Sequence, residues 1–77
     1  MNFGEALECL KEGEKVTTKG WGHAYIQLYE PDDTDVVSMS YIYMTLESGT
    51  KTIWMPTHSE LLDEGWKIYD DFGMDGL

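Results

Sequence analysis

A tight turn that places a tryptophan and a histidine beside glycines is the stretch of this sequence best suited to ligand binding. It reads Lys19-Gly20-Trp21-Gly22-His23. Glycine adopts backbone dihedrals that other residues avoid, and it lets a ligand approach the main chain closely. An indole ring offers a flat stacking surface, and an imidazole can donate or accept a hydrogen bond. The turn is therefore predicted to be a binding loop in which Trp21, Gly22 and His23 face the ligand.

A second group of candidate binding residues lies at the start of a predicted helix. Thr57 and Glu60 stand three positions apart, which is the spacing of a capping box. Free N–H groups at a helix start favour an anion, and a nearby indole adds a second flat ring. These groups would suit a nucleotide-like small molecule. The candidate residues in this part of the chain are Trp54, Pro56, Thr57, His58 and Glu60.

Metal binding, catalysis and simple packing are the alternative roles for these residues. His23, His58 and Glu60 could form a two-histidine, one-carboxylate metal site, or the two histidines could act as acid and base in an enzyme. Trp21 and Trp54 could instead be anchors of the core or of a subunit interface. The sequence contains no phosphate loop, dinucleotide fingerprint or nucleophile elbow. We therefore expect no catalytic residues, no bound metal and no cofactor.

The length and the cysteine content predict one small domain that needs additional stabilisation. A chain of 77 residues is expected to bury only ~60% of the surface that it exposes when unfolded. Its single cysteine, Cys9, cannot form an intramolecular disulfide. A partner subunit, a ligand or very good packing would supply the missing stability, which favours a homo-oligomer.

The charge argues against polyanionic partners. Fifteen acidic residues stand against five lysines, with no arginine, which gives a formal net charge of −10. Binding of DNA, RNA or an anionic membrane normally requires clustered basic residues, so none of these partners is expected. A small anion could still be held by backbone N–H groups, hydroxyls and a few lysines. The chain also lacks an apolar run long enough to span a membrane and lacks the pattern of a secretory signal, so we expect an intracellular protein.

The periodicity of apolar residues predicts an α+β fold. Phe3, Ala6, Leu7 and Leu10 have the spacing of one helical face, and Asn2 fits a helix cap. The expected order αββββαβ describes a small antiparallel sheet of four to five strands with an N-terminal helix and a second short helix. The predicted elements are a helix at 3–12, strands at 15–18, 24–29, 36–46 and 51–55, a helix at 57–64 and a strand at 66–69. Residues 1–70 would form a single domain, followed by an acidic tail at 71–77.

The alternation of side chains predicts two different faces of the sheet. The helices should cover an aliphatic face. The opposite face, rich in Tyr and Trp, would be an unusually large exposed patch, which indicates a subunit interface or a ligand surface. The alternative is an ordinary solvent face with half-exposed tyrosines. The expected aliphatic set is Ala24, Ile26, Leu28, Ile42, Met44, Leu46, Ile53 and Met55. The expected opposite set is Tyr25, Gln27, Tyr29, Tyr41, Tyr43, Thr45, Thr52 and Trp54.

Two segments carry a resemblance to a known family. These are the opening MNFGEALECLKEGEKVTTKGW and the later IWMPTHSELLDEGW, which are separated by a strand and an aromatic-rich hairpin. In this combination the chain resembles, over nearly its whole length, the small phage proteins of the second Thoeris anti-defence family, formerly a domain of unknown function. It differs from the usual family pattern at Gly22-His23, where relatives have Asn-Gly, at Thr57-His58, where they often have Ser-Gln, and at Gly65, where they usually have Asp.

The resemblance implies a binding protein rather than an enzyme. Members of the family sequester a cyclic ADP-ribose isomer, the signal of a bacterial antiphage system, in pockets between the protomers of a homo-oligomer, with a tetramer as the expected state. Some relatives also look able to hold cyclic oligonucleotide signals at separate sites. The implied location is the cytoplasm of the infected bacterium, and Trp21 and residues 56–60 would line the pocket. A signal-degrading enzyme and a protein-binding module that blocks a host factor are the alternatives.

Overall fold

The computed structural model describes residues 1–32 and 39–70. It contains two helices and five strands in the order αββββαβ, so the predicted α+β fold is confirmed. Two predicted segments lie outside the described residues. One is the acidic tail at 71–77, and the other is residues 33–38, which belong to the predicted acidic loop and to the start of the predicted third strand. The elements are α1 (Phe3–Lys11), β1 (Val16–Thr18), β2 (Tyr25–Tyr29), β3 (Tyr41–Thr45), β4 (Lys51–Ile53), α2 (His58–Leu62) and β5 (Trp66–Ile68).

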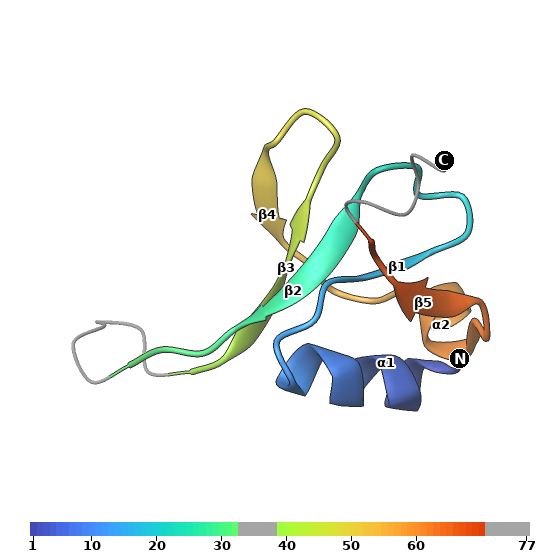
Figure 1. The fold of residues 1–77 in the computed structure, drawn as a ribbon, viewed down its shortest axis with the longest axis horizontal. Helices are drawn as coiled ribbons and strands as arrows, with labels where there is room; N and C mark the ends of the chain where they lie inside the picture. Colours follow the sequence, from blue (N-terminus) through green and yellow to red (C-terminus); the bar gives the residue numbers. More distant parts are fainter. Residues whose placement is uncertain (33–38, 71–77) are drawn as a thin grey trace.

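The five strands form one antiparallel sheet in the order β4-β3-β2-β1-β5 (Figure 1). The β2–β3 pair is the longest, running from Tyr25 opposite Thr45 to Tyr29 opposite Tyr41. Its far end projects away from α1, which contributes to the elongated shape of 40 × 26 × 21 Å. β1 pairs with β2 on one side and with β5 on the other, so the last strand of the fold lies beside the first.

Both helices begin with the capping boxes that the sequence predicted. In α1, the Asn2 side chain accepts the N–H of Glu5 and the Glu5 carboxylate accepts the N–H of Asn2, each at 2.9 Å. In α2, Thr57 and Glu60 make the same pair of bonds at 3.2 and 2.8 Å. These reciprocal bonds satisfy N–H groups that have no partner within the helix. Local sequence thus determines where each helix starts.

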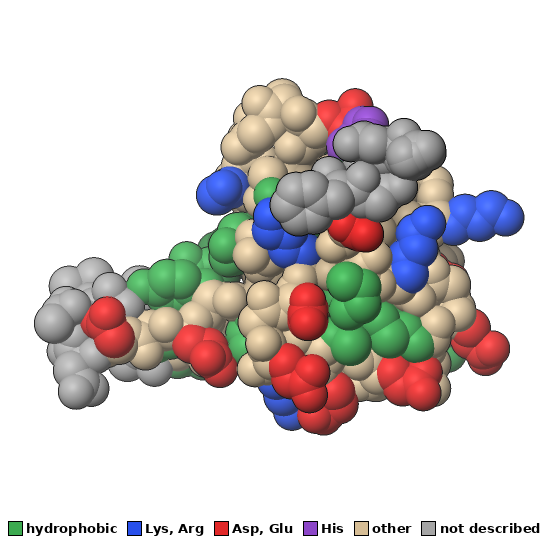
Figure 2. Space-filling view, in the orientation of Figure 1, with side chains coloured by type: hydrophobic (Ala, Val, Ile, Leu, Met, Phe, Trp, Pro, Cys, Tyr) green, Lys and Arg blue, Asp and Glu red, His purple; other side chains and the backbone are tan. Residues whose placement is uncertain are grey.

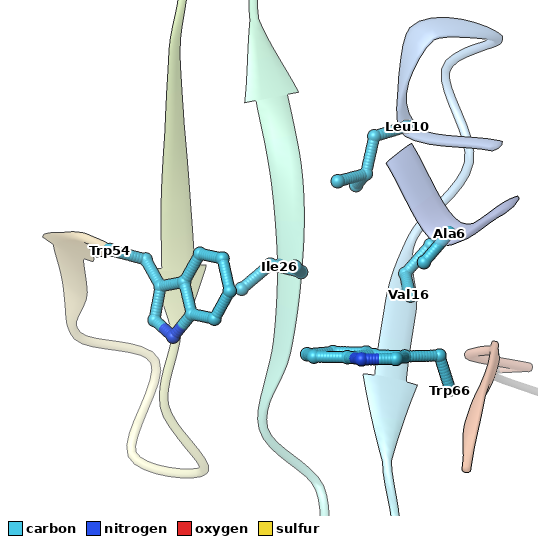
Figure 3. Close-up of a cluster of buried hydrophobic side chains, with 6 residues drawn as sticks. All are labelled: Ala6, Leu10, Val16, Ile26, Trp54 and Trp66. Carbon is cyan, nitrogen blue, oxygen red and sulfur yellow. The ribbon is translucent and has the colours of Figure 1, made fainter. Parts of the chain in front are cut away.

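The core lies between α1 and one face of the sheet. Trp66 and Ile26 are almost completely buried, and Ala6 and Leu10 of α1 pack against them (Figure 3). This arrangement matches the predicted apolar stripe of the first helix. The buried cluster consists of Ala6, Leu10, Val16, Ile26, Trp54 and Trp66.

The predicted faces are correct for β2 and β3 but wrong for β4. Ile26 and Met44 are paired on the core side, as expected. On β4, however, Ile53 is opposite Tyr43 and is 67% exposed, whereas Trp54 donates its backbone N–H to Ile42 and is only 9% exposed. The β3–β4 turn sets a register one residue away from the one that the sequence suggested, and such a shift exchanges the two faces of a strand. Met55, also expected on the aliphatic face, is 80% exposed.

Every helix and strand is shorter than predicted, and three of them differ by more than one residue. Within the described residues, β3 begins at Tyr41 rather than at 36, and β4 ends at Ile53 rather than at 55. The second helix covers His58–Leu62 rather than 57–64.

Asp63 joins the end of α2 to β1 through its carboxylate. The Thr18 hydroxyl donates to Oδ2 at 2.5 Å, and the N–H of Gly65 donates to Oδ1 at 2.8 Å. Hydrogen bonds to the charged form favour it, so the Thr18 hydroxyl first and the Gly65 N–H second lower the pKa of Asp63 below its ordinary value of 3.8.

The lowered pKa of Asp63 predicts a specific loss of stability in acid. The stabilisation from this carboxylate is complete above the ordinary pKa of 3.8 and is lost as the pH falls through the lower folded-state pKa. We expect the free energy of unfolding of Asp63→Asn to fall less steeply below about pH 4 than that of the wild type. Urea unfolding at a series of pH values measures both curves, with Glu14→Gln as a control. Parallel curves for Asp63→Asn and the wild type would contradict the prediction.

Candidate functional site

Trp21 lies against the core instead of projecting from the glycine turn. Its ring meets those of Trp66 and Trp54 edge-on, at centroid distances of 5.2 and 6.0 Å. The side chain is half-buried, so part of the indole stays accessible. Edge-to-face packing of this kind stabilises aromatic pairs beyond their buried area. Trp21 is therefore a packing residue in this chain, and its contact with a ligand remains a prediction.

Trp54 is a core residue. The centroid of its ring lies 5.9 Å from that of Phe3 and 6.0 Å from that of Trp66. We call the group formed by Phe3, Trp21, Trp54 and Trp66 the tryptophan cluster. The expectation that Trp54 lies on the aromatic face of the sheet is wrong, for the reason of register given above. The alternative from the sequence, that these tryptophans anchor the core, matches this geometry.

Gly22 and His23 do lie at the surface. Gly22 has a φ of +64°, in the left-handed region where a side chain is disfavoured. The backbone N–H of His23 donates to the Glu47 carboxylate at 3.1 Å, which joins the turn between β1 and β2 to the turn between β3 and β4. A Cβ at position 22 would lie 2.5 Å from an oxygen of that carboxylate. The positive φ is therefore what favours glycine at this position, whereas the exposed Glu47 side chain could move aside for a Cβ.

A hollow of about 440 Å³ opens beside this turn. Ligand pockets typically have volumes of about 300–1,000 Å³. Lys67 supplies a positive charge at the surface, whereas Asp70 supplies a negative one, so the hollow is not uniformly basic. We call it the turn hollow, and its lining residues are Thr17, Gly22, His23, Lys67, Ile68, Tyr69 and Asp70.

Pairing between distant strands builds the wall of the turn hollow. Thr17 of β1 is opposite Lys67 of β5, on the face of the sheet away from α1. Tyr69 follows β5 and stacks on Tyr25 at a centroid distance of 4.6 Å, and the Lys15 ammonium lies 4.9 Å from the Tyr25 ring. Thr17, Lys67 and Tyr69 were not among the candidate residues predicted from the sequence. The alternation of side chains in residues 15–18 and 66–69 indicated that both segments are strands. It did not indicate that the two strands pair with each other.

A second hollow, of about 330 Å³, lies farther along the same face. Tyr29 and Tyr41 stack there at 4.9 Å, and the Tyr43 hydroxyl donates to Gln27 at 3.1 Å. We call it the tyrosine groove, and its lining residues are Tyr29, Tyr41, Tyr43, Lys51, Thr52 and Ile53. Figure 2 shows hydrophobic side chains gathered along the projecting β2–β3 pair. The predicted aromatic face is thus present, with Ile53 in place of Trp54.

The predicted residues at the start of α2 are separate from both hollows. Thr57 and Glu60 use their side chains in the capping box, and Pro56 and His58 are exposed. These four residues line neither the turn hollow nor the tyrosine groove. The alternative metal site is not formed either, because within residues 1–32 and 39–70 no three His, Cys, Asp or Glu side chains are grouped so that they could hold a metal ion.

Comparison with protein families identifies the chain. Residues 1–69 match the family described as Tad2-like, the Thoeris anti-defense 2-like domain. The chain belongs to this family. The Tad2-like match covers both segments on which the sequence resemblance rested and confirms that resemblance. A search of curated proteins found no match. Among the described residues, no helix is long and apolar enough to cross a membrane.

Proposed function

We propose that this protein is a sponge for a nucleotide-derived immune signal. Membership of the Tad2-like family supports a phage anti-defence role, and it is the observation that carries the proposal. In the proposed mechanism the protein binds a cyclic ADP-ribose isomer, and also cyclic oligonucleotide signals, without degrading them. Bound signal cannot reach its effector, so inhibition depends on affinity and abundance rather than on turnover. The site of action is the cytoplasm of the infected bacterium.

The turn hollow supports the proposal as the position for an anionic, planar ligand. The Lys67 ammonium is suited to phosphate oxygens, and the Tyr69 ring is suited to stacking. The hollow is open at the surface of a single chain. A second protomer packed on the aromatic face, in a homotetramer, would close it and bury more of the ligand. The residues at the start of α2 and the accessible part of Trp21 would then line the pocket from a neighbouring protomer.

The experiment separates sequestration from degradation and from protein binding. The purified full chain is titrated with the cyclic ADP-ribose isomer by calorimetry, and the mixture is then denatured by heat and analysed by mass spectrometry. A sponge gives saturable heat and returns the ligand unchanged. A degrading enzyme returns product, and a module that binds only a host protein gives no heat. Light scattering of the same sample tests the tetramer.

A further inference from the structure

The β4 strand leaves one edge of the sheet open. It stands at the end of the order β4-β3-β2-β1-β5, away from α1 (Figure 1), and among the described residues it pairs with β3 alone. The opposite edge is different. There Trp66 of β5 donates its N–H to the carbonyl of Met1 at 3.1 Å, and its carbonyl accepts a hydrogen bond from the Met1 ammonium at 2.9 Å. The chain thus covers part of the β5 edge with its own backbone, and within residues 1–32 and 39–70 it makes no such contact at the β4 edge.

The pairing of β4 with β3 determines which backbone groups point out from this edge. Trp54 donates its N–H to the carbonyl of Ile42 at 2.9 Å, so these two residues form a hydrogen-bonded pair. Hydrogen-bonded and non-hydrogen-bonded pairs alternate along an antiparallel ladder. Ile53 and Lys51 therefore belong to non-hydrogen-bonded pairs, and their N–H and C=O groups point away from β3. The Thr52 hydroxyl approaches the Ile53 carbonyl only to 3.5 Å, which is longer than an ordinary O–H···O bond.

The features that usually protect an edge strand are weak on β4. Natural edges carry charged side chains, and β4 has one, Lys51. Its ammonium lies 5.9 Å from the centroid of the Tyr43 ring on β3, so the charge is directed inward over the sheet rather than out across the edge. Beside it Ile53 is 67% exposed, and Met55 just beyond the strand is 80% exposed. Outward N–H and C=O groups beside exposed apolar side chains form a template for another strand.

We propose that β4 pairs with β4 of a second copy of this chain, in antiparallel orientation and centred on Thr52. This inference rests on the homo-oligomer of the proposed function and names one of its contacts. In this register the outward groups of Lys51 face those of Ile53 in the second copy, so each N–H meets a carbonyl on both sides of a two-fold axis. No two lysines are directly opposite each other, so the pairing avoids repulsion between like charges. The edge is thus complementary to itself, as a two-fold interface requires.

The second copy extends the tyrosine groove. Directly opposite residues of an antiparallel pair lie on the same face of a sheet, so Lys51 of the second copy lies beside Ile53, on the face that carries Tyr43. Lys51 and Ile53 line the groove at its β4 side, so the grooves of the two copies join across the axis. The groove of a single chain is therefore incomplete without its neighbour. Strand pairing is a small contact, so in the proposed tetramer it acts together with the contact on the aromatic face.

Disulfide cross-linking tests the pairing and its register. Cys9→Ser gives a background without cysteine, and Thr52→Cys or Lys51→Cys then adds a single one. In the proposed register the two copies of position 52 have Cα atoms about 4.5 Å apart, whereas those of position 51 are diagonal neighbours, about 7–8 Å apart. A disulfide needs Cα atoms within roughly 4.4–6.8 Å of each other. We expect oxidised glutathione to cross-link Thr52→Cys at least about 10-fold faster than Lys51→Cys, as measured on non-reducing gels.

Ile53→Pro tests whether the backbone makes the contact. The Ile53 N–H points away from β3, so proline at this position removes a donor of the edge and no bond within the sheet. Added to Thr52→Cys, it should slow cross-linking about 10-fold, because a hydrogen bond is lost on each side of the axis. Ile53→Thr keeps the N–H and should slow cross-linking less. Far-UV circular dichroism shows whether each variant is folded, and the comparison of positions 52 and 51 carries the test if Ile53→Pro is not.

Three outcomes would overturn the inference. Absence of a disulfide dimer of Thr52→Cys would show that the β4 edge does not pair with itself. An equal or higher rate at position 51 would trace the cross-link to random collision or to another register. An unchanged rate in the folded Ile53→Pro variant would show that the backbone of the edge makes no contact. None of these results decides the sponge proposal, which depends on heat and recovered ligand with the cyclic ADP-ribose isomer.

Discussion

Replacing Trp66 with alanine should lower the free energy of unfolding by about 3–5 kcal/mol. Trp66 is 1% exposed, and its ring contacts Phe3 at 5.4 Å, Trp21 at 5.2 Å and Trp54 at 6.0 Å. Its indole N–H also donates to the carbonyl of Glu60 at 3.1 Å, which attaches α2 to the core. Small domains are stable by only about 5–15 kcal/mol, so this change removes a large part of the total. Urea unfolding followed by far-UV circular dichroism measures the loss.

Two variants control for the effect of Trp66→Ala. Trp66→Phe loses the hydrogen bond to Glu60 but keeps an aromatic ring in the cluster. Because the ring still fills most of the space, Trp66→Phe should be less destabilising than Trp66→Ala. Met55→Ala changes a side chain that is 80% exposed and should alter stability by less than about 0.5 kcal/mol. All samples need the same protomer concentration, because the stability of an oligomer depends on it. A loss below about 1 kcal/mol for Trp66→Ala would show that the tryptophan cluster is not the centre of the core.

Reversing the charge of Lys67 should weaken binding of the cyclic ADP-ribose isomer by about 10- to 100-fold. The ammonium lines the turn hollow, where it would attract the phosphates of the ligand. Lys67→Glu replaces an attraction by a repulsion, and each unit charge at contact distance contributes on the order of 1 kcal/mol in water. A change of about 1.4 kcal/mol corresponds to a factor of 10 in affinity. Calorimetric titration of the wild type and the variant measures the ratio.

The control for Lys67→Glu is the same substitution at Lys11. Lys11 is on α1, on the other side of the sheet from the hollow, and its ammonium lies 3.6 Å from the Glu8 carboxylate. Lys11→Glu changes the net charge equally and should leave ligand affinity within about twofold. If both variants lose affinity to the same extent, the effect comes from the total charge. If neither does, the ligand binds elsewhere than the turn hollow.

The sequence determined the elements of the fold and the starts of the helices. The stripe formed by Ala6 and Leu10, the two capping boxes and the alternation within β2 each depend on residues that are close together in the chain. The same locality explains why Gly22 and His23 could be identified as surface turn residues. Local propensity and period are properties of a short segment, so they can be read without knowing what the segment packs against.

Only the tertiary structure determined which side chains share a face and a hollow. The register of β4, one residue from the expected one, placed Trp54 in the core and Ile53 on the aromatic face. The pairing of β1 with β5 brought Lys67 to the glycine turn, and the β3–β4 turn brought Glu47 to His23. These contacts join residues far apart in the chain, and a shift of one residue in any pairing would exchange the faces. The candidate binding loop therefore followed from the sequence, whereas the positions of Trp21 and Glu47 around it depended on long-range packing.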